Sequence, residues 1–272
     1  LDNTKCMYIN QLDEIFIVSS SIITHIVKLN PEGELDLTYG ESGISTTSLL
    51  SSVQEIKPFP LETNEHLILS GGTINPGASH PGLCVILADG TANESFGEDG
   101  VARIEGVEGH FYSVCYLPES EEIYACGLKM GTLSELLVAK FTIDGEPDIS
   151  FGDGGYIIEE NPIGYLDFFQ PKLIYDQQND QLIIGCHILW AEGDTDIVLR
   201  KLTADGEPVN SFGDEGWAHI TMPSSNETFS SIALQEDGMV YFAGSTATSG
   251  SEDHLLGKVK MDGYLDTDFG EN

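Results

Sequence analysis

The side chains best suited to bind a ligand lie in segments that differ from one part of the chain to the next. In the segment WAEGDTD (190–196), Trp190 stands close to three carboxylates. An indole ring offers a large contact surface and carboxylates accept hydrogen bonds, which suits contact with a protein or a glycan. Packing of Trp190 inside the fold is an equally open alternative. The predicted partner-binding residues are Trp190, Glu192, Asp194, Tyr165, His80 and His110, with Asp196 beside Trp190.

Local motifs for catalysis or metal binding are absent from the sequence. The seven His show no HxH or HExxH spacing, the five Cys form no CxxC pair, and no P-loop, GxGxxG or GxSxG occurs. We therefore expect no catalytic residue, no metal ligand and no cofactor. A carboxylate pair for glycoside hydrolysis stays open as an alternative, because the chain has 45 acidic residues.

A repeated turn motif organises the chain. It consists of Asp or Glu and Gly, five residues rich in Asp, Asn, Ser and Thr, and then Phe or Tyr and Gly. The last glycines of the motif, at 40, 97, 152, 213 and 270, are 57, 55, 61 and 57 residues apart. The motif occurs in PEGELDLTYGESG (31–43), ADGTANESFGEDG (88–100), IDGEPDISFGDGG (143–155), ADGEPVNSFGDEG (204–216) and MDGYLDTDFGEN (261–272).

The sequence between the motifs predicts β-strands. Each unit has three runs of alternating apolar residues before the motif and a shorter run after it, rich in β-branched and aromatic residues. Four strands per unit are typical of propeller blades, which cover one another's faces. We expect one domain over residues 1–272, a single five-bladed β-propeller with units at about 1–49, 50–105, 106–160, 161–222 and 223–272. Either the last blade has three strands, or a longer natural chain supplies the fourth.

The motif residues are interpreted as turn chemistry. Gly supplies positive φ, Asp accepts backbone hydrogen bonds, and the aromatic ring of each unit is expected to pack between blades. Ca²⁺ binding by these acidic turns is the alternative. It is disfavoured because Val209 replaces the acidic position in one unit and no bidentate carboxylate is fixed by the motif.

Composition limits the partners. Eleven basic and 45 acidic residues give a formal net charge of −34, which argues against nucleic acid and anionic membranes as partners. No apolar run reaches the length of about 20 residues that a membrane helix needs. Hydrophobic residues make up 40%, enough for a folded core, and we expect a monomer.

The run IDGEPDISFGDGG resembles the Delta-60 repeat family, found in tandem arrays mainly in bacterial proteins, and the resemblance extends over all five units. It implies a β-propeller-like array, often in exported or surface-associated proteins, and it brings no catalytic residues. Glu32, Tyr39, Val209 and the short last unit depart from the pattern.

The favoured function is a non-catalytic binding propeller that engages a protein or a glycan through its variable loops, since function tends to lie on loops held by a rigid scaffold. The alternatives are a carbohydrate-active hydrolase with carboxylates at the channel mouth and a structural surface module. We expect a secreted or cell-surface bacterial protein, with a cytoplasmic location as the alternative.

Overall fold

The structure, a computed structural model, describes residues 4–61, 63–73, 79–159, 165–190, 193–222, 226–248 and 251–270. Every regular element in this part of the chain is a β-strand, and the strands form five sheets in which consecutive strands are neighbours. Four of these sheets have four strands and the last has three. The predicted all-β fold of four-stranded antiparallel units is thus confirmed at this level. The chain divides into two compact units: unit 1 is Leu1–Met130 with Leu137–Tyr156, and unit 2 is Gly131–Leu136 with Ile157–Asn272.

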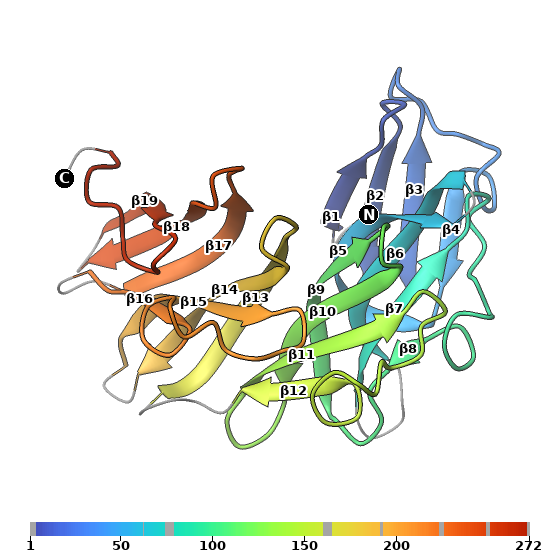
Figure 1. The fold of residues 1–272 in the computed structure, drawn as a ribbon. Coiled ribbons are helices and arrows are strands. Elements are labelled where there is room, and N and C mark those ends of the chain that lie inside the picture. The colour runs from blue at the N-terminus through green and yellow to red at the C-terminus, as the bar shows by residue number, and fades with distance from the viewer. Residues whose placement is uncertain are drawn as a thin grey trace. The chain divides into compact units, whose positions relative to one another are not determined.

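Unit 1 holds the first two sheets and most of the third (Figure 1). In each of them the chain passes from the first strand to the fourth without a crossover. The strands are β1 (Thr4–Ile9), β2 (Ile15–Ser20), β3 (Thr24–Leu29) and β4 (Ile44–Thr47); β5 (Leu50–Leu61), β6 (Thr63–Thr73), β7 (Pro81–Ile86) and β8 (Ala102–Arg103); and β9 (Gly109–Leu117), β10 (Glu122–Lys129), β11 (Glu135–Thr142) and β12 (Tyr156–Glu159).

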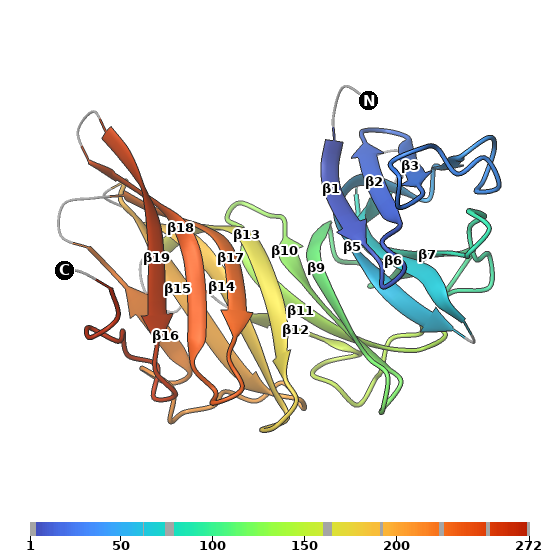
Figure 2. The ribbon, with the colours of Figure 1, turned by 90° about the horizontal axis from the view of Figure 1, so that it is seen from above.

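Unit 2 holds the last two sheets. Their strands are β13 (Tyr165–Asp176), β14 (Gln181–Trp190), β15 (Thr195–Thr203) and β16 (Trp217–Ile220), followed by β17 (Asn226–Leu234), β18 (Val240–Thr248) and β19 (Ser251–Val259). Within each unit the first strands of consecutive sheets contact each other, β1 with β5, β5 with β9, and β13 with β17 (Figure 2).

Burial of both sheet faces explains the apolar composition of the middle strands. Strands β7, β11 and β15 carry six or more successive buried residues, so both faces of each strand are shielded from solvent. By contrast, β17 alternates between buried and exposed positions at its start, and most of β19 is exposed. The apolar core therefore lies between sheets.

Main-chain contacts between glycines join consecutive sheets. The N–H groups of Gly40, Gly97 and Gly213 donate to the carbonyls of Asp89, Asp144 and Asp262 in the next repeat, each at 2.7 Å. A Cβ on Gly90, Gly145 or Gly263, which follow these aspartates, would stand within 2.3–2.8 Å of the nitrogen of the facing glycine. We call each such contact a glycine clasp. The glycine after the aspartate is needed because two main chains touch there. The glycine after the aromatic is needed because its Cβ would lie 1.9–2.3 Å from a carbonyl oxygen of its own turn, and both glycines have positive φ.

The aromatic residue of the motif is a core residue in four units. Tyr39, Phe96, Phe151 and Phe212 are at most 2% exposed, as expected for rings that pack between sheets. Phe269 is only half-buried and meets Tyr241 edge-on, with ring centroids 5.4 Å apart. Burying such a ring stabilises the fold by about 1.5–3 kcal/mol.

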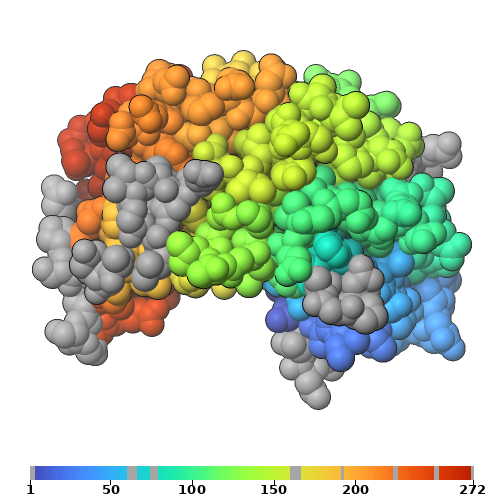
Figure 3. Space-filling model, turned by 90° about the horizontal axis from the view of Figure 1, so that it is seen from below, coloured from blue at the N-terminus to red at the C-terminus, as the bar shows by residue number. Residues whose placement is uncertain are grey.

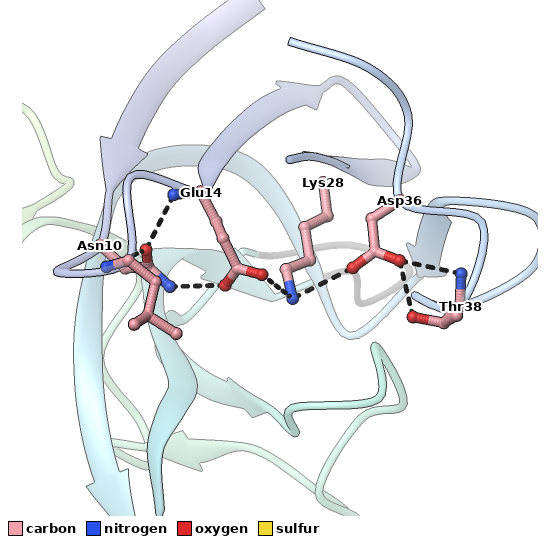
Figure 4. A network of polar contacts seen from close by, with 6 residues as sticks. Asn10, Glu14, Lys28, Asp36 and Thr38 are labelled. Carbon is pink, nitrogen blue, oxygen red and sulfur yellow. Dashed lines mark hydrogen bonds and ion pairs between the residues drawn. The ribbon is translucent and has the colours of Figure 1, made fainter. Parts of the chain in front are cut away.

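A lysine on the third strand ties the turn motif to the first hairpin of its sheet (Figure 4). Nζ of Lys28 lies 2.9 Å from Oε1 of Glu14 and 3.2 Å from Oδ2 of Asp36. Asp36 in turn accepts hydrogen bonds from the backbone and hydroxyl of Thr38, and Asn10 donates to Glu14. Burial lowers the pKa of Lys28, but the bonds to Glu14 and Asp36 outweigh it, and its pKa lies above the ordinary lysine value.

The same arrangement recurs in the third and fifth units, whereas the second unit has Val85 and Asn93 at the two positions. Lys140 pairs with Glu122 and Asp148, and Lys258 pairs with Asp266. Lys201 occupies the equivalent position in the fourth unit, where Val209 replaces the motif carboxylate. Burial there lowers the pKa of Lys201, although Asp176 raises it in part.

Candidate functional site

The hairpin between β14 and β15 positions the residues around Trp190. The N–H of Trp190 donates to the carbonyl of Asp194 at 2.8 Å, and Gly193, at φ 88°, returns an N–H to the carbonyl of Trp190 at 2.9 Å. This connection places Asp194 directly before β15 and Asp196 at the second residue of that strand. Asp194 is half-buried and Asp196 is buried.

Asp196 is a buried carboxylate with one unsatisfied oxygen. Its side chain is buried, with 2% of the residue exposed. Oδ2 accepts hydrogen bonds from the indole N–H of Trp190 and from the hydroxyl of Thr221, the latter at 3.2 Å. Oδ1 is buried and has no hydrogen-bond partner among the described residues. Buried carboxylate oxygens are normally hydrogen-bonded, so this one marks a place where a polar ligand would be stabilised.

A second buried carboxylate lies in the next sheet of unit 2. Glu227, at 0% exposure, points to the same side of β17 as Phe229. Its Oε2 accepts a hydrogen bond from the N–H of Met222 at 3.4 Å, and Oε1 accepts one from Thr246 at 3.4 Å. Since Thr221 and Met222 are consecutive, one short segment contacts both Asp196 and Glu227. The neighbouring Asn226 also accepts a long hydrogen bond from the N–H of Thr195 at 3.3 Å.

We call Trp190, Asp194, Asp196, Thr221 and Glu227 the unit 2 site. Trp190 and Asp194 are partly exposed, so they provide the accessible surface of this site, whereas Asp196 and Glu227 lie behind it. Tyr165 pairs with Trp190 in the register of β13 and β14.

Two of the predicted partner-binding residues, Trp190 and Asp194, belong to the unit 2 site. Trp190 and Asp194 lie together as expected, and Tyr165 faces Trp190 through the strand register. Glu192 and the side chain of Tyr165 lie outside the described residues. The sequence analysis did not select Thr221 or Glu227. One signal could have identified Glu227. It is a charged residue at a position that the alternation of polar and apolar side chains along β17 assigns to the buried face.

The two predicted histidines lie in unit 1 and form a separate group. Nδ1 of His80 lies 2.7 Å from the carbonyl oxygen of Val107 and must therefore carry a proton and donate. Nδ1 of His110 is buried without a hydrogen-bond partner in the described part of the chain, and burial lowers the pKa of His110. A Cβ on Gly72 would collide with Nδ1 of His110 and Oγ of Ser79, so these groups approach the same glycine. Both histidines belong to unit 1, whereas Trp190, Asp196 and Glu227 belong to unit 2.

The carboxylates of the repeated turns are engaged within their own turns. Oδ1 of Asp148 accepts hydrogen bonds from the N–H and the hydroxyl of Ser150, at 3.1 and 2.6 Å. Asn93 makes the same two contacts with Ser95 in the second unit, which shows that the turn does not require a charge. Among the described residues, no group of three or more His, Cys, Asp or Glu side chains is arranged to hold a metal ion. In the part of the chain that the structure describes, no helix is long and apolar enough to cross a membrane.

Sequence comparison gives no relative, whereas structural comparison does. No family model matches the chain, and a search of the curated proteins finds no match. The fold is similar to that of an endo-arabinase from Bacteroides thetaiotaomicron, with a TM-score of 0.51 and 9% identity over 93% of this chain and 92% of that one. It is also similar to a periplasmic gluconolactonase from Pseudomonas aeruginosa, with a TM-score of 0.52 and 14% identity over 95% of this chain and 69% of that one.

These likenesses concern the fold, and they support a β-propeller. They also correct two expectations from the sequence. The interpretation as a non-catalytic binding module, and the expectation that the chain is not an enzyme, are wrong, because the solved structures that share the fold are enzymes. The error has a physical origin: the repeated turn motif reports how sheets are joined, and the buried Glu227 lies outside it, in a segment that no repeat singles out.

Proposed function

We propose that the chain is a carbohydrate-active hydrolase whose reaction takes place at the unit 2 site. The observation that carries this proposal is the pair of buried carboxylates, Asp196 and Glu227. They accept hydrogen bonds from the consecutive residues Thr221 and Met222, and the partly exposed indole of Trp190 donates to Asp196. Two carboxyl groups around one bond are what glycoside hydrolysis needs. The fold of an endo-arabinase supports the same class of reaction.

The chemistry divides between the two acidic groups. One carboxyl group, as an acid, gives its proton to the oxygen of the leaving sugar while the bond from that oxygen to the anomeric carbon breaks. The other carboxylate either removes a proton from the attacking water or attacks the anomeric carbon itself. Water supplies the hydroxyl that ends on the anomeric carbon, and no further reactant is needed. Trp190 offers its partly exposed ring to a sugar face, and Asp194 accepts hydrogen bonds from sugar hydroxyls.

The finer architecture belongs to the same proposal. We infer a closed five-bladed ring with one blade per repeat, built from Delta-60-type units, in a protein that is secreted or displayed at the cell surface. The support is the sequence repeat, the agreement between sheets and repeat units, and the fold of a periplasmic enzyme. A cysteine introduced on β1 and another on β17 would cross-link in an oxidised closed ring and would stay free in an open array.

The decisive experiment is a hydrolysis assay with matched variants. The purified chain is incubated with a panel that includes arabinan, xylan and other neutral polysaccharides, and released reducing ends are measured. Wild-type protein is expected to release sugar from at least one of them. Asp196→Asn and Glu227→Gln are each expected to lower the rate at least 100-fold with near-native circular dichroism.

Asp148→Asn is the matched control, because it removes a carboxylate from a repeated turn that Asn93 shows to tolerate an amide. It is expected to retain activity. Activity that survives both Asp196→Asn and Glu227→Gln would place the reaction elsewhere. A panel without any hydrolysis would contradict the proposed class.

A further inference from the structure

A cavity of about 250 Å³ lies in unit 1, and no residue of the unit 2 site lines it. Its walls come from the end of the second repeat, green in Figure 3, and from the turn motif of the third, which is yellow-green there. The residues that matter for binding are Val101, Arg103, Glu105, Glu146, Pro147 and Tyr156.

The main polar group of this cavity is the guanidinium of Arg103. The side chain is 25% exposed and forms ion pairs with Glu98 and Glu105, both of which lie at the exposed rim. The hydrogen bond from Arg103 lowers the pKa of Glu105, so both groups are charged at neutral pH. A guanidinium has five N–H donors in a fixed plane, and a carboxylate has only acceptors.

The floor and one side of the cavity are apolar. Val101 is 5% exposed and Ile104 is 2% exposed, while Pro147 and Tyr156 are half-buried. A ligand that fits must therefore combine an apolar face with groups that donate and accept hydrogen bonds together.

Charge selects among such ligands. One arginine stands against Glu98, Glu105 and Glu146, so the lining is net negative and repels anions. Hydroxyl groups both donate and accept, which lets adjacent hydroxyls contact carboxylate and guanidinium at once. We propose that this cavity binds a neutral saccharide ring, with its apolar face on Tyr156 and Pro147 and two neighbouring hydroxyls on Arg103 and Glu105.

The repeat itself does not require this arrangement. Counted from the glycine after the motif aromatic, the position of Arg103 holds Thr46, Ile158 and His219 in other units. Arginine is thus dispensable for building a sheet. The walls are nevertheless held firmly, because the clasp between Gly97 and Asp144 joins the two sides at 2.7 Å.

The test is a titration followed by ¹⁵N NMR of the full chain. The probes are methyl β-D-glucopyranoside and glucuronate, a neutral sugar ring and an anionic relative of it. With the neutral ring, the amide signals of Gly154 and Tyr156 and the Nε–H signal of Arg103 are expected to shift to saturation. Glucuronate is expected to bind at least tenfold more weakly.

Arg103→Thr installs the residue of the first repeat and is expected to weaken binding at least tenfold, and Glu105→Gln gives a milder second variant. Lys57→Thr, at an exposed lysine of β5, is the matched control and should bind as wild type. Equal binding by Arg103→Thr and wild type, tighter binding of glucuronate, or no shift with either probe at 100 mM would each overturn the proposal. This site does not depend on hydrolysis in unit 2: Asp196→Asn should lose activity and keep these shifts.

Discussion

The two ends of the sheets are built on different principles. At the end that carries the repeated turns, contacts are short in sequence or made by main-chain atoms: Asp148 holds Ser150, and Gly97 holds the carbonyl of Asp144. At the opposite end, in unit 2, contacts are made by unlike side chains from distant segments, such as Asp196 with Thr221 and Thr246 with Glu227. The turn carboxylate of Asp148 is hydrogen-bonded within its own turn, whereas Oδ1 of Asp196 has no hydrogen-bond partner in the described structure. Contacts at the first end join neighbouring sheets, whereas contacts at the second end hold the side chains of the proposed catalytic site. We expect substitutions at the two ends to have different effects.

The largest loss of stability is expected at Gly97, a glycine whose N–H forms one of the clasps. A Cβ in Gly97→Ala would lie 2.3 Å from the carbonyl oxygen of Val101, at a φ of 60° that L-residues rarely adopt. We expect a loss of about 3–5 kcal/mol in the free energy of unfolding, measured with urea. The control is Gly154→Ala, whose φ is also positive but whose Cβ meets nothing within 4 Å. It should cost about 1–2 kcal/mol, and equal losses would show that the close approach is unimportant.

At the loop end, Trp190→Phe is expected to affect function more than folding. It removes the indole N–H that donates to Oδ2 of Asp196 and leaves that oxygen with Thr221. We expect about 1–3 kcal/mol of lost stability, and a hydrolysis rate reduced at least tenfold because Asp196 loses its orientation. Urea unfolding and the hydrolysis assay measure the two effects. Unchanged activity at unchanged stability would remove Trp190 from the site.

A smaller and pH-dependent effect is expected for Asp148→Asn. The hydrogen bond from Ser150 lowers the pKa of Asp148 below the ordinary value, with Lys140 also contributing. A lowered folded-state pKa stabilises the fold above the unfolded pKa of about 3.9, and this stability is lost as the pH falls through the folded value. The variant should be about 0.5–1 kcal/mol less stable than wild type at pH 7, with the gap closing below pH 4. A gap that is constant down to pH 2 would contradict this origin.

The smallest change in stability is expected for Val209→Asp. It restores to Lys201 the carboxylate that Lys28, Lys140 and Lys258 already have, but it removes an apolar side chain packed on the core. The two effects oppose each other, so the net change should stay within about 1 kcal/mol. The pKa of Lys201 should rise, as NMR of its Cε would show. An unchanged pKa would mean that position 209 does not face the ammonium group.

This contrast also explains what the sequence could predict. Turns such as Asp36 to Thr38 span two residues, and four of the five units repeat this contact, so a single sequence reveals the strands and their grouping. Glu227 and Thr246 are far apart in the chain and occur once, so no period points to them. The lysine network was also missed, because Lys28 needs Glu14 from a different hairpin to complete it. The motif dense in Asp drew attention to turns, whereas the carboxylates that we propose for catalysis, Asp196 and Glu227, are buried and lie outside the motif.

The glycine clasp has a consequence for the history of the chain. Because it is made from an amide and a carbonyl of the main chain, any copy of the unit that keeps its two glycines can join any other copy. Gene duplication could therefore lengthen the array without inventing a new interface, and the loops at the far end were free to diverge afterwards. Molecules of this kind acquire new activities by accumulating differences in only one half of each duplicated unit.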